Sequence, residues 1–146
     1  MRTGFARLPL LGLAALALAG CRRSHHVIDD PPPVSAPGPF RVTTLELGNA
    51  LDPVNHVIAP AASFRSDDTI YVSILSEGAA PEVTLGARWT SEDGEVVDES
   101  TRVIMPSGPT ATEFHATRPN GWEPGHYAVE VTADGVAAGN RDFEVR

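Results

Sequence analysis

The chain of 146 residues contains one cysteine, no lysine and few aromatic residues. A single cysteine excludes an internal disulfide, so a folded domain must rely on its hydrophobic core. The 11 basic residues are all arginine and are outnumbered by 19 acidic residues. This balance argues against nucleic-acid binding and against electrostatic capture by anionic lipid, because both need basic patches.

Long hydrophobic runs are also absent. The apolar run over residues 8–19 has 12 positions and contains Pro9 and Gly12, whereas a transmembrane helix needs about 20 apolar residues. Arg2 and Arg7 precede this run, and small residues end it. A charged start, a short apolar stretch and small residues before a cleavage point are typical of a secretory signal peptide, which we expect over residues 1–20.

The motifs of common enzyme sites are missing as well. The chain has no Gly-x-Ser-x-Gly elbow, no Gly-rich phosphate loop and no dinucleotide fingerprint. Its histidines form neither an H-x-H nor an H-E-x-x-H pattern. We therefore expect no enzymatic activity, no catalytic residue and no cofactor.

The end of the predicted signal peptide, Leu18-Ala19-Gly20-Cys21, resembles the lipobox of bacterial lipoproteins. The resemblance implies that the thiol of Cys21 receives a diacylglyceryl group, that the chain is cut before Cys21 and that the new amine is acylated, for example with palmitate. A stable anchor needs more than one chain, because one short acyl chain binds membranes only marginally. The residue after the cysteine is Arg22 and not an aspartate. By resemblance to enterobacterial lipoproteins, this implies sorting to the outer membrane.

A proline-rich linker is expected to join the lipidated cysteine to a domain, over residues 21–39. Its five prolines favour extended polyproline geometry, at about 3.1 Å per residue, which gives a reach of roughly 55 Å from the lipid. The mature chain would keep nine arginines against 19 acidic residues, a net charge of −10, which we interpret as a solubility feature. Residues of metal-ligand type in the linker are interpreted as solvated, because no scaffold positions them: His25, His26, Asp29 and Asp30.

Residues 40–146 are expected to form one domain, since 107 residues suffice for a single core and no internal repeat is visible. Apolar and polar residues alternate with a period of two; Ile70, Val72 and Ile74, for example, share one face of a strand. Asp93-Gly94 and Asp134-Gly135 are hairpin signals between such runs. The predicted strands are 41–47, 54–58, 69–76, 82–90, 95–105, 110–117, 126–132 and 137–145. Seven or eight strands with regular turns predict an all-β antiparallel sandwich.

The stretch WEPGHYAVEV, from Trp122 to Val131, resembles the corner before the penultimate strand of immunoglobulin-like and fibronectin type III-like domains. The resemblance implies an immunoglobulin-like β-sandwich in which the Tyr127 hydroxyl bonds to the backbone a few residues upstream. It also implies that Trp89 is the buried tryptophan of the third strand. The intersheet cysteines of antibody domains are absent.

Two features are candidate binding sites. Trp122 lies in a predicted loop, where it either contacts a sugar or a protein partner, or folds over the open end of the sandwich. His115 and His126 lie on predicted outward faces, near Glu113 and Glu130, and would form a surface metal site if their strands pair. We favour the folded tryptophan and the solvated histidines, and hence no metal.

The pair Asp67-Asp68 precedes a predicted strand. It either binds calcium or forms the turn that leads into that strand, and we favour the turn.

These observations predict a non-enzymatic, lipid-anchored module of the bacterial cell envelope. It would contact the membrane through Cys21, bind or scaffold another envelope protein through an edge strand or end loops, and bind no nucleic acid. The alternative is a small ligand-binding module, for sugar or metal, of the periplasm or cell surface.

Overall fold

The computed structural model describes residues 35–146. The predicted signal peptide, Cys21 and most of the predicted linker lie outside these residues. All regular elements of the described part are β-strands, and no helix within it is long and apolar enough to cross a membrane. The strands are β1 (Arg41–Gly48), β2 (Ser63–Phe64), β3 (Ile70–Glu77), β4 (Val83–Ser91), β5 (Val96–Ile104), β6 (Thr110–Ala116), β7 (Gly125–Ala133) and β8 (Val136–Val145).

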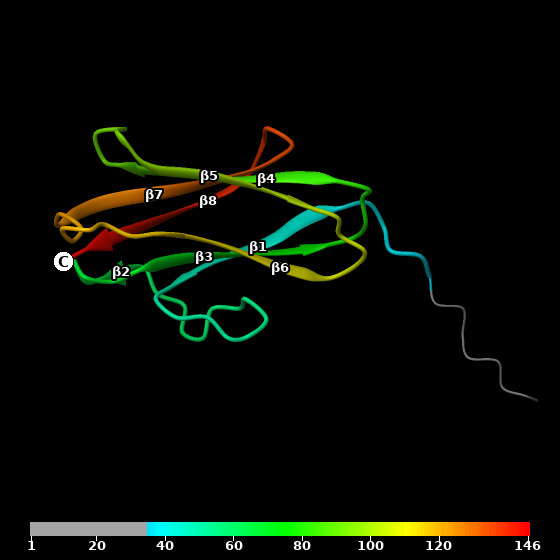
Figure 1. The fold of residues 1–146 in the computed structure, drawn as a ribbon, viewed down its shortest axis with the longest axis horizontal. Helices are drawn as coiled ribbons and strands as arrows, with labels where there is room; N and C mark the ends of the chain where they lie inside the picture. The colour runs from blue at the N-terminus through cyan, green and yellow to red at the C-terminus, as the bar shows by residue number, and fades with distance from the viewer. Residues whose placement is uncertain (1–34) are drawn as a thin grey trace, which may run out of the picture. The chain divides into compact units, whose positions relative to one another are not determined.

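The strands form two sheets that pack face to face (Figure 1). One sheet has the order β1-β3-β6 and the other the order β2-β8-β7-β4-β5. All pairings are antiparallel except that of β2 with β8, which spans two residues. An all-β, two-sheet sandwich with this strand order is immunoglobulin-like, which confirms the predicted fold class.

The core lies between the sheets and follows the predicted alternation. In β3, Ile70, Val72 and Ile74 are fully buried, and in β4 the side chain of Trp89 is fully buried. Trp89 therefore occupies the place that the resemblance implied. The remaining core positions come from inward-facing residues of the strands and from one loop residue: Leu45, Leu47, Phe64, Val83, Leu85, Ala87, Phe114, Ala116, Trp122, Tyr127, Val129, Val131, Phe143 and Val145.

The predicted strand at residues 54–58 is wrong. This segment belongs to a loop in which Asn55 has a φ of 67°, and the Asp52 carboxylate accepts hydrogen bonds from the backbone N–H groups of Val54 and His56 at 2.9 and 2.8 Å. Such local bonds favour turns over sheet ladders. The strand that follows β1 and precedes β3 in the sequence is instead the two-residue β2, which pairs with β8.

The loop that contains this segment lies against the outer face of the β1-β3-β6 sheet (Figure 1). The Ser73 hydroxyl donates to the Asn55 carbonyl at 2.6 Å, and the Asn55 amide donates to the carbonyl of Ala111 at 3.4 Å. The loop thereby covers part of a sheet face that alternation alone predicts to be solvated.

Both Asp-Gly pairs form the expected turns. Asp134 and Gly135 have φ values of 51° and 79° between β7 and β8, as a two-residue type I′ hairpin requires. Gly94 has a φ of 80° and donates to the Ser91 carbonyl at 2.9 Å between β4 and β5.

The start of the domain is fixed to the β3–β4 connection. The Ala79 N–H donates to the Gly38 carbonyl at 2.8 Å, and Pro39 forms a bridge with Ala79. Gly78 has a φ of 88°, and any side chain there would collide with the Pro39 carbonyl. This chain entrance and the C-terminal Arg146 lie at opposite ends of the sandwich (Figure 1).

The predicted tyrosine corner is confirmed. The Tyr127 hydroxyl donates to the Glu123 carbonyl at 2.9 Å. The Tyr127 ring stacks on Phe143, with a centroid distance of 5.4 Å and an interplanar angle of 15°. The bond fixes the loop before β7 to the strand that follows it.

Replacing Tyr127 with phenylalanine tests this bond. Tyr127→Phe should lower the free energy of unfolding by about 1 kcal/mol, because it leaves the Glu123 carbonyl without its donor. Urea denaturation followed by circular dichroism measures the change. Tyr71→Phe is the matched control, since Tyr71 is only partly buried; equal stabilities of the two variants would show that the corner bond contributes nothing.

Candidate functional site

Trp122 is a buried side chain, so it does not provide the exposed aromatic surface that sugar stacking needs. Its side chain is 2% exposed. The indole N–H donates to the Asp68 carbonyl at 3.0 Å, and the backbone N–H donates to the Ser66 carbonyl at 2.7 Å. The ring also packs edge-on against Tyr127 and Phe143. Trp122 therefore folds over the end of the core and ties the loop before β7 to the loop before β3.

His115 and His126 do not come together. His115 lies on β6 and His126 on β7, and these strands belong to different sheets. The metal site that strand pairing would have produced is therefore not formed. Within residues 35–146, no group of three or more His, Cys, Asp or Glu side chains is arranged to hold a metal ion.

Each histidine instead has local partners. His115 Nδ1 lies 3.1 Å from Glu113 Oε2, and its ring packs against Tyr71 with a centroid distance of 5.4 Å. His126 is opposite Glu144 in the β7–β8 ladder. The hydrogen bond from Arg146 lowers the pKa of the Glu144 carboxyl, and the charges of Arg146 and His126 act in the same direction.

Asp67 and Asp68 form the turn before β3. Asp68 Oδ2 accepts the backbone N–H of Arg65 at 2.8 Å, and Asp68 Oδ1 accepts the Asn49 amide at 3.4 Å. Asp67 is paired with the guanidinium of Arg65 at 3.2 Å. Both carboxylates therefore make contacts within the turn before β3, as the sequence analysis favoured.

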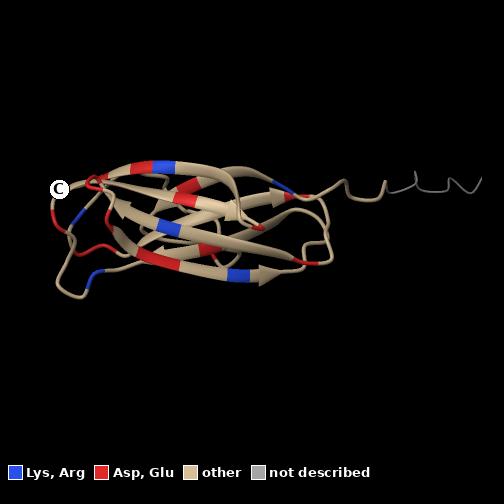
Figure 2. Cartoon of the chain, turned by 90° about the horizontal axis from the view of Figure 1, so that it is seen from above, with Lys and Arg blue, Asp and Glu red and all other residues tan. Residues whose placement is uncertain are grey.

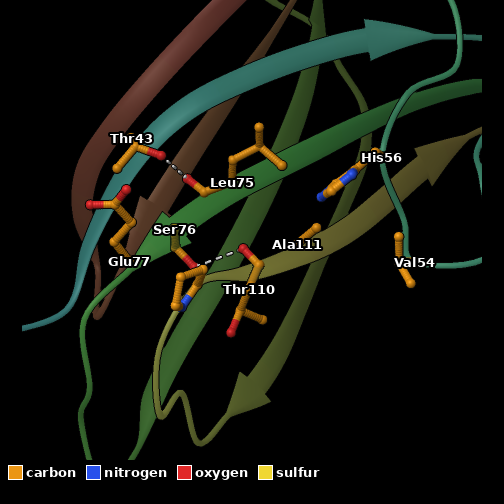
Figure 3. A pocket seen from close by; sticks show the side chains of 9 residues that line it. Thr43, Val54, His56, Leu75, Ser76, Glu77, Thr110 and Ala111 are labelled. Atoms are coloured by element: carbon orange, nitrogen blue, oxygen red, sulfur yellow. Dashed lines mark hydrogen bonds between the residues drawn. The ribbon is translucent and has the colours of Figure 1, made fainter. Parts of the chain in front are cut away.

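A shallow cavity of about 430 Å³ lies on the outer face of the β1-β3-β6 sheet. Figure 3 shows Thr43, Ser76 and Thr110 on its floor and His56 beside it, on the loop that crosses this face. The hydroxyls of Thr43 and Ser76 donate to the carbonyls of Leu75 and Thr110 at 3.1 and 3.2 Å. The hydroxyl protons on the cavity floor are therefore already bonded within the protein.

Side-chain hydrogen bonds join the two sheets at two places along their edges. The edge of β1 faces β8, where the Arg141 guanidinium donates its Nε–H to the Leu45 carbonyl at 3.0 Å. The edge of β6 faces β5 across the open side of the sandwich, where Arg102 Nη2 donates to Glu113 Oε1 at 3.3 Å. The same guanidinium lies over the Phe114 ring, 5.4 Å from its centroid.

The outer edge of β5 is open. β5 is the last of five strands in its sheet and is paired with β4 alone. Within residues 35–146, no other segment forms a backbone hydrogen bond to it. Val103 and Met105, at the end of β5 and just beyond it, are 57% and 78% exposed. β5 therefore presents unpaired N–H and C=O groups at alternate positions along its nine residues.

Comparison with known proteins gives similarity of fold only. No family model and no curated protein matches the chain. An immunoglobulin-like protein from Pseudomonas aeruginosa is 15% identical, with a TM-score of 0.48 over 73% of this chain and 96% of its own. The CARDB domain of a Pyrococcus furiosus protein, solved in complex with di-metal ions, is 12% identical, with a TM-score of 0.45 over 76% and 90%.

A third solved structure is the alkylpurine DNA glycosylase AlkC of Pseudomonas fluorescens, bound to DNA with an abasic site analogue. It is 17% identical, with a TM-score of 0.47 over 75% of this chain. The chain spans 31% of the length of that enzyme. The immunoglobulin-like assignment itself rests on the strand order and the tyrosine corner of this chain.

Sequence reasoning did not single out β5 as the open edge. Alternation predicts strands without their order in a sheet, because every strand of a sandwich shows the same period. One signal is nevertheless present in the sequence: Asp98, Glu99 and Arg102 place charges on both faces of a single strand. Charges on both faces are typical of an exposed edge strand.

The burial of both tryptophans can be measured in solution. Trp89 and Trp122 are 0% and 2% exposed, so acrylamide should quench the fluorescence of the native protein much less than that of the urea-unfolded protein. Wall polysaccharides should leave the emission unchanged, because neither indole face is accessible. Equal quenching in the two states, or an emission shift with a sugar, would contradict the buried position of Trp122.

Proposed function

We propose that the protein is a non-enzymatic, lipid-anchored module of the bacterial cell envelope that binds or scaffolds another envelope component through the open edge of β5. The observation that supports this proposal is the unpaired edge itself. An extended segment of a partner can add to such an edge through main-chain hydrogen bonds, while side chains on the two faces give specificity.

The surroundings of β5 favour strand addition over non-specific aggregation. The strand carries Asp98, Glu99 and Arg102 among exposed apolar residues. Charges on an edge strand discourage uncontrolled pairing. Figure 2 shows both acidic and basic residues along the strands of the domain.

The anchor fits this role. If Cys21 is lipidated, the linker joins the domain at Gly38, at one end of the sandwich. A linker reach of roughly 55 Å exceeds the length of a nine-residue strand, about 30 Å. The edge of β5 would then be accessible to a neighbour on the same membrane.

The side chains that were predicted to bind a small ligand are not placed to do so. Trp122 is buried, and the two histidines lie on different sheets. The cavity beside His56 remains for it, but that cavity is open and its floor hydroxyls already donate within the protein. The edge of β5 is the stronger candidate.

The anchor is tested by replacing the predicted lipidation site. Cys21→Ser should move the protein from the membrane fraction to the soluble fraction, because no other part of the sequence is predicted to hold lipid. Fractionation and immunoblotting of cells that express each form measure the distribution. Retention of Cys21→Ser in the membrane fraction would contradict lipid anchoring at this residue.

The binding edge is tested by photo-crosslinking in intact membranes. A photo-crosslinking amino acid at Thr101 of β5 should give a specific adduct with an envelope protein. The same amino acid at Asn140 of β8 should not, although both residues are exposed on the same sheet. Adducts from Asn140 alone, or from neither position, would contradict binding through β5.

A further inference from the structure

We propose that the partner at the open edge of β5 is a second copy of this chain, paired antiparallel about a two-fold axis at Ser100. The inference rests on the proposed function, because it names the occupant of the same edge. It comes from the order of charges along β5, which is complementary to itself when the strand is reversed.

Symmetry limits how two copies of β5 can pair. In an antiparallel pair, the sequence numbers of any two facing residues add up to the same value. The backbone N–H and C=O groups of two facing residues must either both point toward the partner strand or both point away from it. Backbone orientation alternates along a strand, so a two-fold axis must place one residue opposite its own copy. In the middle of β5 the axis can therefore lie at Glu99, Ser100 or Thr101.

The axis at Ser100 is the only one of the three that pairs opposite charges. It sets Asp98 of each copy opposite Arg102 of the other, so two ion pairs form symmetrically. An axis at Glu99 would bring two carboxylates face to face. An axis at Thr101 would set Asp98 opposite Ile104 and leave Arg102 opposite a serine. Opposite charges across a strand pair stabilise it, and like charges destabilise it.

The charged residues also lie on the same face of the sheet. Asp98 is opposite Trp89 in the β4–β5 ladder, and Arg102 is opposite Leu85. Trp89 and Leu85 both face the core, so Asp98, Ser100 and Arg102 share the side of β5 that overhangs the open flank of the sandwich. After pairing, this side would be continuous between the two copies.

Arg102 can serve both contacts. It donates one hydrogen bond to Glu113 of its own copy at 3.3 Å, and about half of its side chain remains exposed. A guanidinium has five N–H donors in a planar fork, so donors remain for Asp98 of the second copy. The bond to Glu113 holds the guanidinium at the open flank, which reduces the entropy lost when the copies meet.

Anchoring would favour the dimer. Two domains tethered to one membrane have a raised effective concentration for each other. Antiparallel pairing sets the two domain entrances at opposite ends of the β5 pair. The linker reach of roughly 55 Å is longer than the strand, about 30 Å, so both lipids could still enter one membrane.

The first test places a thiol on the axis. In the full-length chain in its own membranes, Ser100→Cys should form a covalent dimer under mild oxidation, seen as twice the mass on a non-reducing gel. Facing residues of an antiparallel pair lie within the Cα distance that a disulfide needs. Ser91→Cys is the matched control, a half-buried serine on β4 that would lie far from its own copy, and it should give no dimer.

The second test exchanges the charges. Asp98→Arg alone and Arg102→Asp alone, each combined with Ser100→Cys, should lower the dimer yield roughly tenfold, because like charges then face each other. When the two variants are expressed together with distinguishable tags, the yield of the mixed dimer should return. A purely structural effect of either substitution would not be rescued by the other copy, so this result does not depend on how well each variant folds.

The outcomes separate this inference from the function on which it rests. A dimer through Ser100→Cys that is rescued by the mixed charges supports the second copy. An adduct at Thr101 with a different protein, without a Ser100→Cys dimer, overturns the second copy but keeps binding through β5. Absence of both the adduct and the dimer overturns the inference and the proposed function together.

Discussion

The packing of aromatic rings around Phe143 is the interaction on which the rest of this domain depends. The Phe143 ring contacts four other rings at centroid distances between 5.4 and 5.9 Å, those of Phe64, Trp89, Trp122 and Tyr127. These rings come from β2, β4, β7, β8 and the loop before β7. In a chain without an internal disulfide, this cluster joins segments that are far apart in the sequence. Edge-on and stacked ring pairs add to the burial of apolar area.

Much of the fold can be predicted from the sequence, because several of its features are periodic or local. The period of two identifies β3, β4 and β7, because one face of each must enter the same core. The Asp-Gly pairs mark two hairpins through their positive φ values. The Tyr127 corner follows from its local sequence, since the bond to Glu123 spans only four positions. Features of this kind depend only on residues that are close together in the sequence, so the local sequence is enough to predict them.

The remaining features depend on distant parts of the chain. Val54 and Ile58 suggest a strand, but Asp52 bonds to the local backbone and turns the segment into a loop. The sequence favours a Trp122 that folds over the end of the sandwich, but it does not identify the acceptor of the indole proton, the Asp68 carbonyl 54 positions away. The separation of His115 from His126 follows from strand order, which alternation does not encode. The open edge of β5 is a property of strand order as well, although its charges give a hint of it.

The fixed chain entrance has a mechanical consequence. Tension on the linker would enter the domain at Gly38, where the bond to Ala79 receives it first, and would then run along β1. The hydrogen bonds between β1 and β3 lie across that direction. They would therefore be loaded together, in shear, and not opened one after another as in peeling. If the proposed anchor and the proposed binding edge are both correct, this load would fall on the β1-β3-β6 sheet, which is not the sheet that contains β5.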